Sequence, residues 1–567
     1  MSQSKMTRRH FLEKVGVGLT TLTVPYPTVS NAQAAKKTNI VLIMADDMGF
    51  SDIGCYGGEI QTPNLNKLAS NGIRFTQFYN MARCCPTRAS LMTGLYPHQA
   101  GMGWMTVRDL GTEGYRGDLN NRCVTIAEVL KQAGYTTYMS GKWHLTFDEY
   151  WDGPKHSWPR QRGFDRFFGT ISGSGSFYTP ETLTRDNTRI QASPGDFYYT
   201  DAITDNASDF ITEHCKSTPD NPFFLYVAYT APHWPLHAKK KDIDKYRDKY
   251  LKGWDALRQE RYARMSAWGS LTGIEMGIID KSCALTAREE NITPWEKVDQ
   301  EKKELMALKM AIYAAQVDCM DQGIGRIVST LEKEGQLENT LIFFLSDNGG
   351  CAEVGPWGFD NKKDGVLGEN SSFSSYGASW ANASNTPFRR YKHWVHEGGI
   401  STPLIVSWPS RIKEHGTFRR QSGHIIDIMA TCVDVAGATY PSEFNGNTIK
   451  PLEGKSLVPV FRNERLERKA IYWEHEANRA VRAGKWKLVS RYRSENNLGP
   501  WELYDMETDR SETKDLAEKY PDRVKELAAM WQQYAERANV LPLDGRPWDE
   551  RLKNPVRSRQ GWPGPKS

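Results

Sequence analysis

The chain has 567 residues, of which 39% are hydrophobic and 25% charged, and its formal net charge at pH 7 is +5. This length exceeds what a single minimal core needs, so we expect one large domain and a smaller one. The positive charge is small and dispersed, which argues against a protein that binds nucleic acid. A local cationic cleft for an anionic substrate is still compatible with this composition.

The first 34 residues have the pattern of an export signal. Two adjacent arginines, Arg8 and Arg9, precede a weakly apolar stretch, and small residues follow it. This combination is typical of a twin-arginine signal peptide, and we expect cleavage after Ala34. No other stretch reaches the ~18 apolar residues that a stable membrane span needs. The mature chain is therefore predicted to pass through the twin-arginine export machinery and to be periplasmic or secreted.

Alternating strand and helix patterns follow the signal. Five short apolar runs that end in polar residues predict buried strands at 39–47, 136–144, 221–233, 339–350 and 401–409. Helical patterns between them lie at 64–72, 125–134 and 313–335. This alternation predicts an α/β fold with a large, mostly parallel mixed sheet flanked by helices.

The domain boundaries follow from changes in composition. A main domain is expected over residues 35–465, with a highly charged helical insertion at 239–310 for which we expect the role of a lid or substrate rim. Alternating strands and a final helix predict a smaller C-terminal antiparallel sheet plus helix over 466–540. Residues 541–567 form a Pro-rich basic tail, for which we expect no structure.

Polar side chains follow several of the predicted strands at the point where each strand ends. In open α/β sheets ligands bind beyond these carboxyl ends. The side chains in question are Asp46, Asp47, Lys142, His144, His233, Asp347 and Asn348. An isolated Asp-Asp or Asp-Asn pair is more often a turn or a helix cap. Two such pairs at one edge offer hard oxygen ligands, which suit Ca²⁺ or Mg²⁺.

Two of the nine cysteines are adjacent, at the predicted start of a helix. Cys84 precedes Pro86 in the first turn, and Arg88 follows within that turn. A cysteine at a helix N-terminus has a lowered pKa and faces backbone N–H groups that bind anions. The number of cysteines is odd and they are scattered along the chain, so they do not predict a disulfide framework. The chemistry leaves open a reactive thiol, a buried thiol beside a proline-started helix, and a vicinal disulfide with Cys85.

The segment C-x-P-x-R followed by ASLMTGLYPH resembles the signature of the formylglycine-dependent sulfatases. The resemblance extends in order along nearly the whole mature chain, through NIVLIMADDMGFSDIGCYGG, TTYMSGKWHL, RGFDRFFG, APHWPLHA, NTLIFFLSDNGG, YKHWVHEGGISTPLIVSWP and WELYDMETDRSE. The chain is most similar to bacterial arylsulfatases of the alkaline-phosphatase-like superfamily. It departs from the commonest signature at Cys85 and Thr87, and Cys85 leaves open a disulfide that blocks maturation.

The resemblance implies a modified nucleophile and a bound cation. Cys84 would be oxidised by a formylglycine-generating maturation enzyme to Cα-formylglycine, whose hydrated aldehyde attacks the substrate. Ca²⁺, with Mg²⁺ as the alternative, would be held by this residue together with Asp46, Asp47, Asp347 and Asn348. Arg88 would hold the modified side chain and balance the carboxylates.

The resemblance also assigns the remaining catalytic residues. Lys142 would contact the sulfate, and His144 would remove a proton so that the sulfate is released. His233 and Lys392 would bind the sulfate and protonate the departing alcohol. Without the resemblance, these histidines are more typical of structural residues and these lysines of the surface.

The predicted function is the hydrolysis of sulfate monoesters, in which a sulfated small molecule or carbohydrate gives an alcohol and inorganic sulfate. Two alternatives stay open: a phosphate or phosphonate ester hydrolase of the same superfamily, and a non-catalytic protein that binds sulfated glycans. Three other histidines lie near the motifs but are more typical of loop or core residues, namely His237, His393 and His396.

Overall fold

The computed structural model describes residues 36–147, 153–193, 195–267, 292–353, 355–361, 364–494 and 497–553. Residues 37 onward form one compact unit, while the predicted signal peptide lies outside the described residues. Within these described ranges, no helix combines the length and the hydropathy that crossing a membrane requires.

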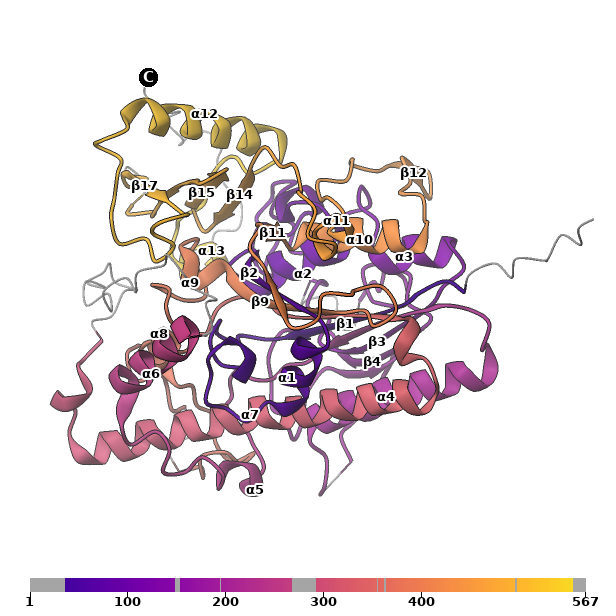
Figure 1. The fold of residues 1–567 in the computed structure, drawn as a ribbon, viewed down its shortest axis with the longest axis horizontal. Coiled ribbons are helices and arrows are strands. Elements are labelled where there is room, and N and C mark those ends of the chain that lie inside the picture. Colours follow the sequence, from indigo (N-terminus) through magenta and orange to yellow (C-terminus); the bar gives the residue numbers. More distant parts are fainter. Residues whose placement is uncertain are drawn as a thin grey trace, which may run out of the picture. The chain divides into compact units, whose positions relative to one another are not determined.

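An eleven-stranded mixed sheet forms the centre of the unit (Figure 1). Its strands are β1 (Asn39–Ala45), β2 (Ile73–Tyr79), β3 (Thr136–Gly141), β4 (Arg166–Thr170), β5 (Leu183–Arg185), β6 (Thr188–Arg189), β7 (Phe223–Ala228), β8 (Thr340–Ser346), β9 (Ser401–Ser407), β10 (Thr417–Arg419) and β11 (Gly423–His424). The order is β10-β2-β9-β8-β1-β7-β3-β4-β5-β6, and β11 pairs with β2. The central strands β8, β1, β7, β3 and β4 are parallel, whereas β9 is antiparallel to both of its neighbours. The predicted fold class is confirmed.

The sequence of β1 explains why this strand lies at the centre. All seven of its residues are buried. Ile40 and Leu42 pack into the hydrophobic core on one face of the sheet, and Val41 and Ile43 pack into the core on the other. A parallel strand covered on both faces is apolar throughout, because successive side chains point to opposite faces.

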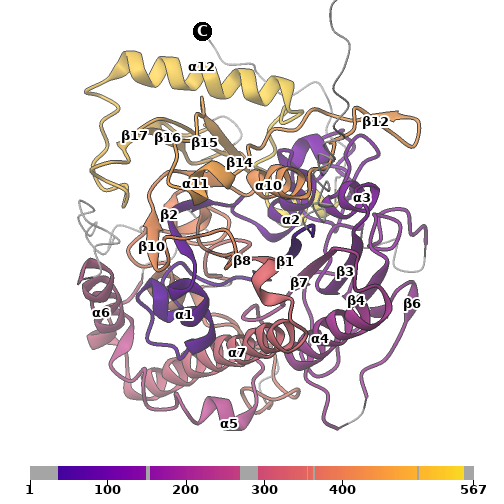
Figure 2. The ribbon, with the colours of Figure 1, turned by 45° about the vertical axis from the view of Figure 1, so that its right-hand side comes forward.

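Helices cover both faces of the sheet (Figure 2). Side chains of α1 (Pro63–Ser70), α4 (Tyr199–Ser217) and α7 (Gln300–Lys333) belong to one core. Side chains of α2 (Cys84–Thr93), α3 (Ile126–Gln132) and α10 (Ile426–Ala436) belong to the other. The helix predicted from residue 313 in fact begins at Gln300, because the side chain of Asp299 caps it by accepting a hydrogen bond from the backbone N–H of Lys302.

The C-terminal region forms the predicted antiparallel sheet with one helix over it. The elements are β14 (Ile471–His475), β15 (Asn478–Ala483), β16 (Trp486–Ser490), β17 (Trp501–Asp505) and α12 (Pro521–Arg537). Trp473 of β14 and Trp531 of α12 belong to the same hydrophobic core as α2 and α10. The small sheet is therefore packed against the large sheet and its helices through a shared hydrophobic core.

The predicted tail is structured over its first part. Residues Trp548–Lys553 form helix α13, and Arg551 in this helix is buried. Its guanidinium Nη1 lies 2.8 Å from Oε1 of Glu476, at the turn after β14. This contact corrects the expectation of an unstructured tail for residues 541–553. Composition alone could not reveal a buried ion pair with a residue 75 positions away.

Candidate active site

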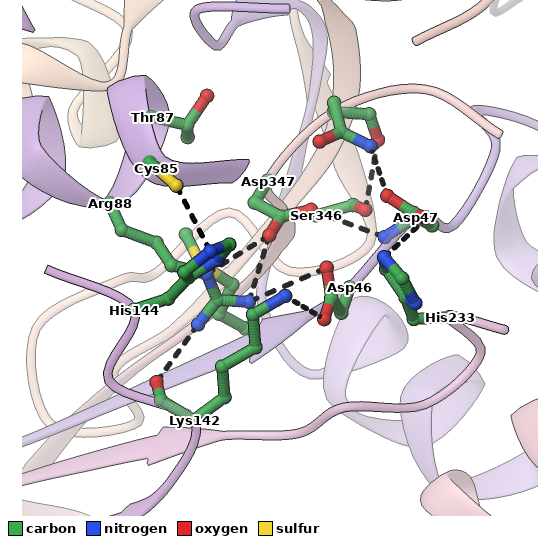
Figure 3. A network of polar contacts seen from close by, with 12 residues as sticks. Asp46, Asp47, Cys85, Thr87, Arg88, Lys142, His144, His233, Ser346 and Asp347 are labelled. Atoms are coloured by element: carbon green, nitrogen blue, oxygen red, sulfur yellow. Dashed lines mark hydrogen bonds and ion pairs between the residues drawn. The ribbon is translucent and has the colours of Figure 1, made fainter. Parts of the chain in front are cut away.

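The polar residues after the parallel strands meet at one edge of the sheet (Figure 3). They come from four strands: Asp46 and Asp47 follow β1, Lys142 and His144 follow β3, His233 follows β7, and Asp347 and Asn348 follow β8. The strands are parallel neighbours, so their carboxyl ends share this edge. The structure therefore brings together the side chains that the sequence predicted at strand ends.

Helix α2 adds the Cys84 thiol and the Arg88 guanidinium to this edge. It begins at Cys84, and all ten of its residues are buried. Arg88 donates from Nε and Nη2 to Oδ2 of Asp347, at 3.1 and 2.8 Å. Its Nη1 donates to the backbone carbonyl of Lys142 at 3.1 Å. Arg88 thus ties the helix to the ends of two strands.

Two buried lysines neutralise two of the aspartates. Nζ of Lys142 lies 2.5 Å from Oδ2 of Asp46, and Nζ of Lys392 lies 2.8 Å from Oδ1 of Asp47. Burial and, next to it, the neighbouring charge of Asp46 raise the pKa of Asp347 to about 8, although Arg88 opposes the shift. An additional cation at this edge would stabilise the ionised form of these acids.

Two oxygen atoms of the acidic cluster are buried without a hydrogen-bond partner, although Oδ1 of Asp46 lies 3.7 Å from Nη2 of Arg88. Within the described residues, Oδ1 of Asp46 and Oδ1 of Asn348 have no hydrogen-bond partner. Asn348 uses its Nδ2 to donate to Oδ1 of Asp47 at 2.7 Å, which leaves its amide oxygen available. Buried unsatisfied oxygens are costly and call for an explanation. Carboxylate and amide oxygens are the ligands of a hard cation, so this donor set fits Ca²⁺ or Mg²⁺.

The adjacent cysteines are both free thiols, and so they do not form the vicinal disulfide that the sequence left open. A hydrogen bond from Cys85 lowers the pKa of Cys84 well below its ordinary value; burial opposes this shift, and nearby His144 and Lys142 favour it. Sγ of Cys85 also lies 3.1 Å from Nε2 of His144. The second cysteine therefore contacts two candidate catalytic groups, Cys84 and His144.

The two candidate histidines are held by backbone features. A Cβ atom on Gly173 would lie 2.2 Å from Cε1 and Nε2 of His144, so only glycine leaves room for this ring. Nδ1 of His233 lies 2.5 Å from the carbonyl oxygen of Trp234. Burial lowers the pKa of His233 to about 4, although Asp47 opposes the shift. A neutral His233 therefore carries its proton on Nδ1 and turns Nε2 toward Lys392, at 3.4 Å.

A cavity of about 840 Å³ opens above these groups. Of the predicted catalytic residues, Cys84, His144, His233 and Lys392 line it, whereas Arg88 and Lys142 lie fully buried beneath. No described residue of the insertion at 239–310 lines this cavity. Its helix α6 (Gly253–Ala267) packs against α8 (Gly377–Ser384) instead, where Arg258 donates to the carbonyl of Asn382. The described residues of the insertion therefore do not form the predicted substrate rim.

Several lining residues were not predicted from the sequence. They include Arg83, Trp234, Glu353, His393, Glu476 and Trp548. Three of them are next to or near predicted residues: Arg83 precedes Cys84, Trp234 follows His233 and His393 follows Lys392. Proximity to a motif was thus an available signal. Glu476 and Trp548 gave no such signal, since only the tertiary fold brings them to the cavity.

The other two histidines near the motifs are structural. Nε2 of buried His237 lies 2.9 Å from the carbonyl oxygen of Ser372. Nε2 of buried His396 lies 3.3 Å from Oε2 of Glu502. Neither His237 nor His396 lines the cavity.

The α/β fold and the charged cavity at the carboxyl ends of its strands fit an enzyme that acts on anionic esters. The sulfatase family profile matches residues 38–438, and a second profile, N-sulphoglucosamine sulphohydrolase, C-terminal, matches residues 389–538. The chain belongs to the sulfatase family, and it is a sulfuric ester hydrolase. The resemblance seen in the sequence motifs is confirmed.

Individual relatives extend over most of the chain. An uncharacterised sulfatase of Schizosaccharomyces pombe is 34% identical, covering 90% of this chain and 96% of its own length. The arylsulfatase of Klebsiella aerogenes is 35% identical, covering 77% of this chain and 96% of its own. An N-acetylglucosamine-6-O-sulfatase of Bacteroides thetaiotaomicron is 29% identical, covering 90% of each.

A solved structure is similar over almost all of the fold. It is a complex of a protein with its substrate D-glucosamine-2-N,6-O-disulfate, and it has a TM-score of 0.58 and 25% identity. The similarity covers 90% of this chain and 100% of that one.

Proposed function

We propose that this chain is an exported sulfatase that hydrolyses sulfate monoesters of carbohydrates or aryl alcohols, with a Cα-formylglycine made from Cys84 and a bound Ca²⁺. One observation carries the proposal. Position 84 lies at the N-terminus of α2 and faces a cavity where cationic groups surround a buried acidic cluster. A sulfate ester is an anion, and catalysis of its cleavage depends on positioning and on stabilising charge.

The cationic groups have distinct places in this proposal. Lys392 lines the cavity and would bind a sulfate oxygen directly. Lys142 lies beneath the cavity and would contact the sulfate from below. Both lysines are paired with aspartates in this structure, so binding the sulfate requires their release by another cation. This coupling explains why lysines and carboxylates occur together.

The acidic cluster would hold that cation through oxygens of Asp46, Asp47, Asp347 and Asn348. The support is the pair of buried oxygens without a hydrogen-bond partner and the hardness of the donor set. When bound, Ca²⁺ would supply positive charge against the sulfate and the nucleophilic oxygen. Arg88 would keep Asp347 ionised and oriented toward it.

The formylglycine would supply an oxygen nucleophile where the cysteine side chain now lies. His144 is placed to accept a proton at this position, because its Nε2 lies 3.1 Å from the neighbouring Sγ of Cys85. His233 and Lys392 lie on the other side of the cluster, with Nε2 and Nζ 3.4 Å apart. We assign protonation of the departing alcohol to this pair, in which the ammonium group of Lys392 carries the proton, because neutral His233 has none on Nε2.

Modification of Cys84 is tested by mass spectrometry together with activity. Trypsin is expected to release CCPTR, residues 84–88, in which replacement of CH₂–SH by CHO gives a defined mass loss. Protein with quantified aldehyde content is then assayed on a panel of sulfated mono- and oligosaccharides, an aryl sulfate and an aryl phosphate. We expect turnover of sulfates in proportion to aldehyde content and none by Cys84→Ala. Full activity of an unmodified thiol would refute the mechanism, and faster turnover of the phosphate would favour the phosphatase alternative.

Export is tested separately. The proposal rests on the paired arginines and on the small residues before Lys36. N-terminal sequencing of protein from the periplasmic fraction is expected to begin at Ala35. Replacing Arg8 and Arg9 together by lysine should retain the chain in the cytoplasm, and unchanged export would rule out the twin-arginine route.

A further inference from the structure

One wall of the cavity is formed by residues from the C-terminal region of the chain. Glu476, from the turn after β14, and Trp548, the first residue of α13, both line the cavity. Neither belongs to the acidic cluster or to the set of groups assigned to the sulfate. Their presence raises the question of what they contact in the substrate.

Helix α13 is fixed to this wall by a buried arginine. Arg551 pairs through Nη1 with Oε1 of Glu476 at 2.8 Å and through Nη2 with the carbonyl oxygen of Asp544 at 2.7 Å. Its guanidinium also lies 4.9 Å from the ring centroid of Trp104. Only 1% of the Arg551 side chain is exposed. A buried guanidinium with this many partners holds the helix in one position.

The same anchor orients two groups toward the cavity. The rings of Trp104 and Trp548 have centroids 4.9 Å apart, so Trp104 supports one side of the Trp548 indole. Oε2 of Glu476 lies 3.0 Å from Nδ1 of His393, which directly follows Lys392. An aromatic ring and a fixed histidine therefore lie in the wall of the cavity that also contains the sulfate-binding lysine.

The chemistry of this wall indicates the kind of group that it binds. Flat indole rings pack against the faces of sugar or aryl rings. Both guanidinium groups of this region are already engaged, Arg551 by Glu476 and Arg83 by Glu353 at 2.7 Å. These two arginines are therefore not available to bind a second anionic group on the substrate. The cavity of about 840 Å³ is far larger than a sulfate group needs, and has room for such a ring.

We propose that helix α13, which Arg551 anchors, forms one wall of a substrate subsite through Trp548. This subsite binds an uncharged ring in the alcohol part of the sulfate ester. Residues 541–553 then set the substrate specificity, which makes a Pro-rich tail part of the binding site. This inference rests on the proposed function, since the ring is the one that carries the scissile sulfate.

The test measures binding in place of turnover. Trp548→Leu is made in a Cys84→Ala chain, in which no formylglycine can form. Calorimetry then measures the binding of N-acetylglucosamine 6-sulfate and of inorganic sulfate to this chain. Leucine keeps apolar packing on Trp104 but lacks a flat face. We expect the sugar sulfate to bind about threefold to tenfold more weakly, with inorganic sulfate unaffected. Trp548→Phe should restore most of the affinity.

Leu552→Ala is the matched control, because Leu552 lies in the same helix and is exposed to solvent. It should bind both ligands as the parent chain does. The proposal is overturned if Trp548→Leu and Leu552→Ala bind the sugar sulfate equally, if inorganic sulfate weakens as much as the sugar, or if the parent binds only inorganic sulfate. A disulfated glucosamine that binds more tightly than the monosulfate would contradict the uncharged character of the subsite.

Failure of the proposed function has a different signature. It is seen as absent sulfate release by aldehyde-containing wild-type protein, whereas the binding experiment uses a chain without the nucleophile. The two outcomes are therefore independent.

Discussion

Arg88 and Asp347 form a two-pronged contact in which Nε and Nη2 both donate to one carboxylate oxygen, and both side chains are completely buried. Removing the arginine would leave a buried carboxylate beside Asp46 without its main partner. We expect Arg88→Ala to lower the free energy of unfolding by about 3–5 kcal/mol. Urea unfolding measures this loss.

The control for this experiment is Arg465→Ala, which removes an exposed arginine that pairs with Glu467 on the surface. Its unfolding midpoint should match that of the wild type. Equal stability of the two variants would show that the Arg88 contact is energetically unimportant. Arg88→Lys should also be destabilised, because an ammonium cannot reproduce the planar, two-pronged geometry.

Gly173 determines whether His144 can take its position. A methyl group at residue 173 would overlap the imidazole, so we expect Gly173→Ala to displace the ring and reduce kcat by about 100-fold or more. Gly175→Ala is the matched control, since a Cβ there has no heavy atom within 4 Å. Steady-state kinetics on an aryl sulfate compare the two. Equal kcat values would mean that His144 is not the proton acceptor.

Calcium should stabilise the folded chain as well as activate it. A ligand that binds only the folded state at 100 times its Kd adds about 2.7 kcal/mol to the free energy of unfolding. We expect chelation to lower Tm, and Asn348→Ala and Asp46→Asn to weaken Ca²⁺ binding at least about tenfold by calorimetry. Asp434→Asn, which changes an exposed carboxylate of α10, serves as the control. Identical Ca²⁺ affinity in all three variants would show that the acidic cluster is not the metal site.

The stability of the chain should fall in mild acid through a buried histidine outside the active site. Burial lowers the pKa of His424 well below its ordinary value, and Arg468 adds to the shift. The unfolded chain binds a proton here below about pH 6.5, whereas the folded chain does not, so stability is lost as the pH falls through this value.

This linkage is measured by urea unfolding at pH 7, 6 and 5. We expect His424→Gln to reduce the slope of stability against pH by up to one proton, about 1.4 kcal/mol per pH unit. His415→Gln alters an exposed histidine and should leave the slope as it is in the wild type. A slope that His424→Gln does not change would mean that His424 is protonated in the folded state.

The sequence by itself determined the central strands and the residues at their carboxyl ends. Runs such as Ile40 to Ala45 are apolar throughout because a parallel strand is buried on both faces, and this pattern is local. The parallel order then requires Asp46, Lys142 and Asp347 to share one edge. The C-x-P-x-R segment predicted Cys84 as the nucleophile, since the residue types and the spacing of this motif lie within one contiguous stretch.

Only the tertiary structure decided which distant segments complete the cavity. Nothing local to Trp548 or Glu476 indicates that Arg551 joins them, because an ion pair across 75 positions depends on how the small sheet packs against the catalytic core. The insertion at 239–310 shows the converse: its charge suggested a rim, but its described helices pack elsewhere. Strands and motifs are set by neighbouring residues, whereas the walls of a binding site are set by long-range packing that periodicity does not encode.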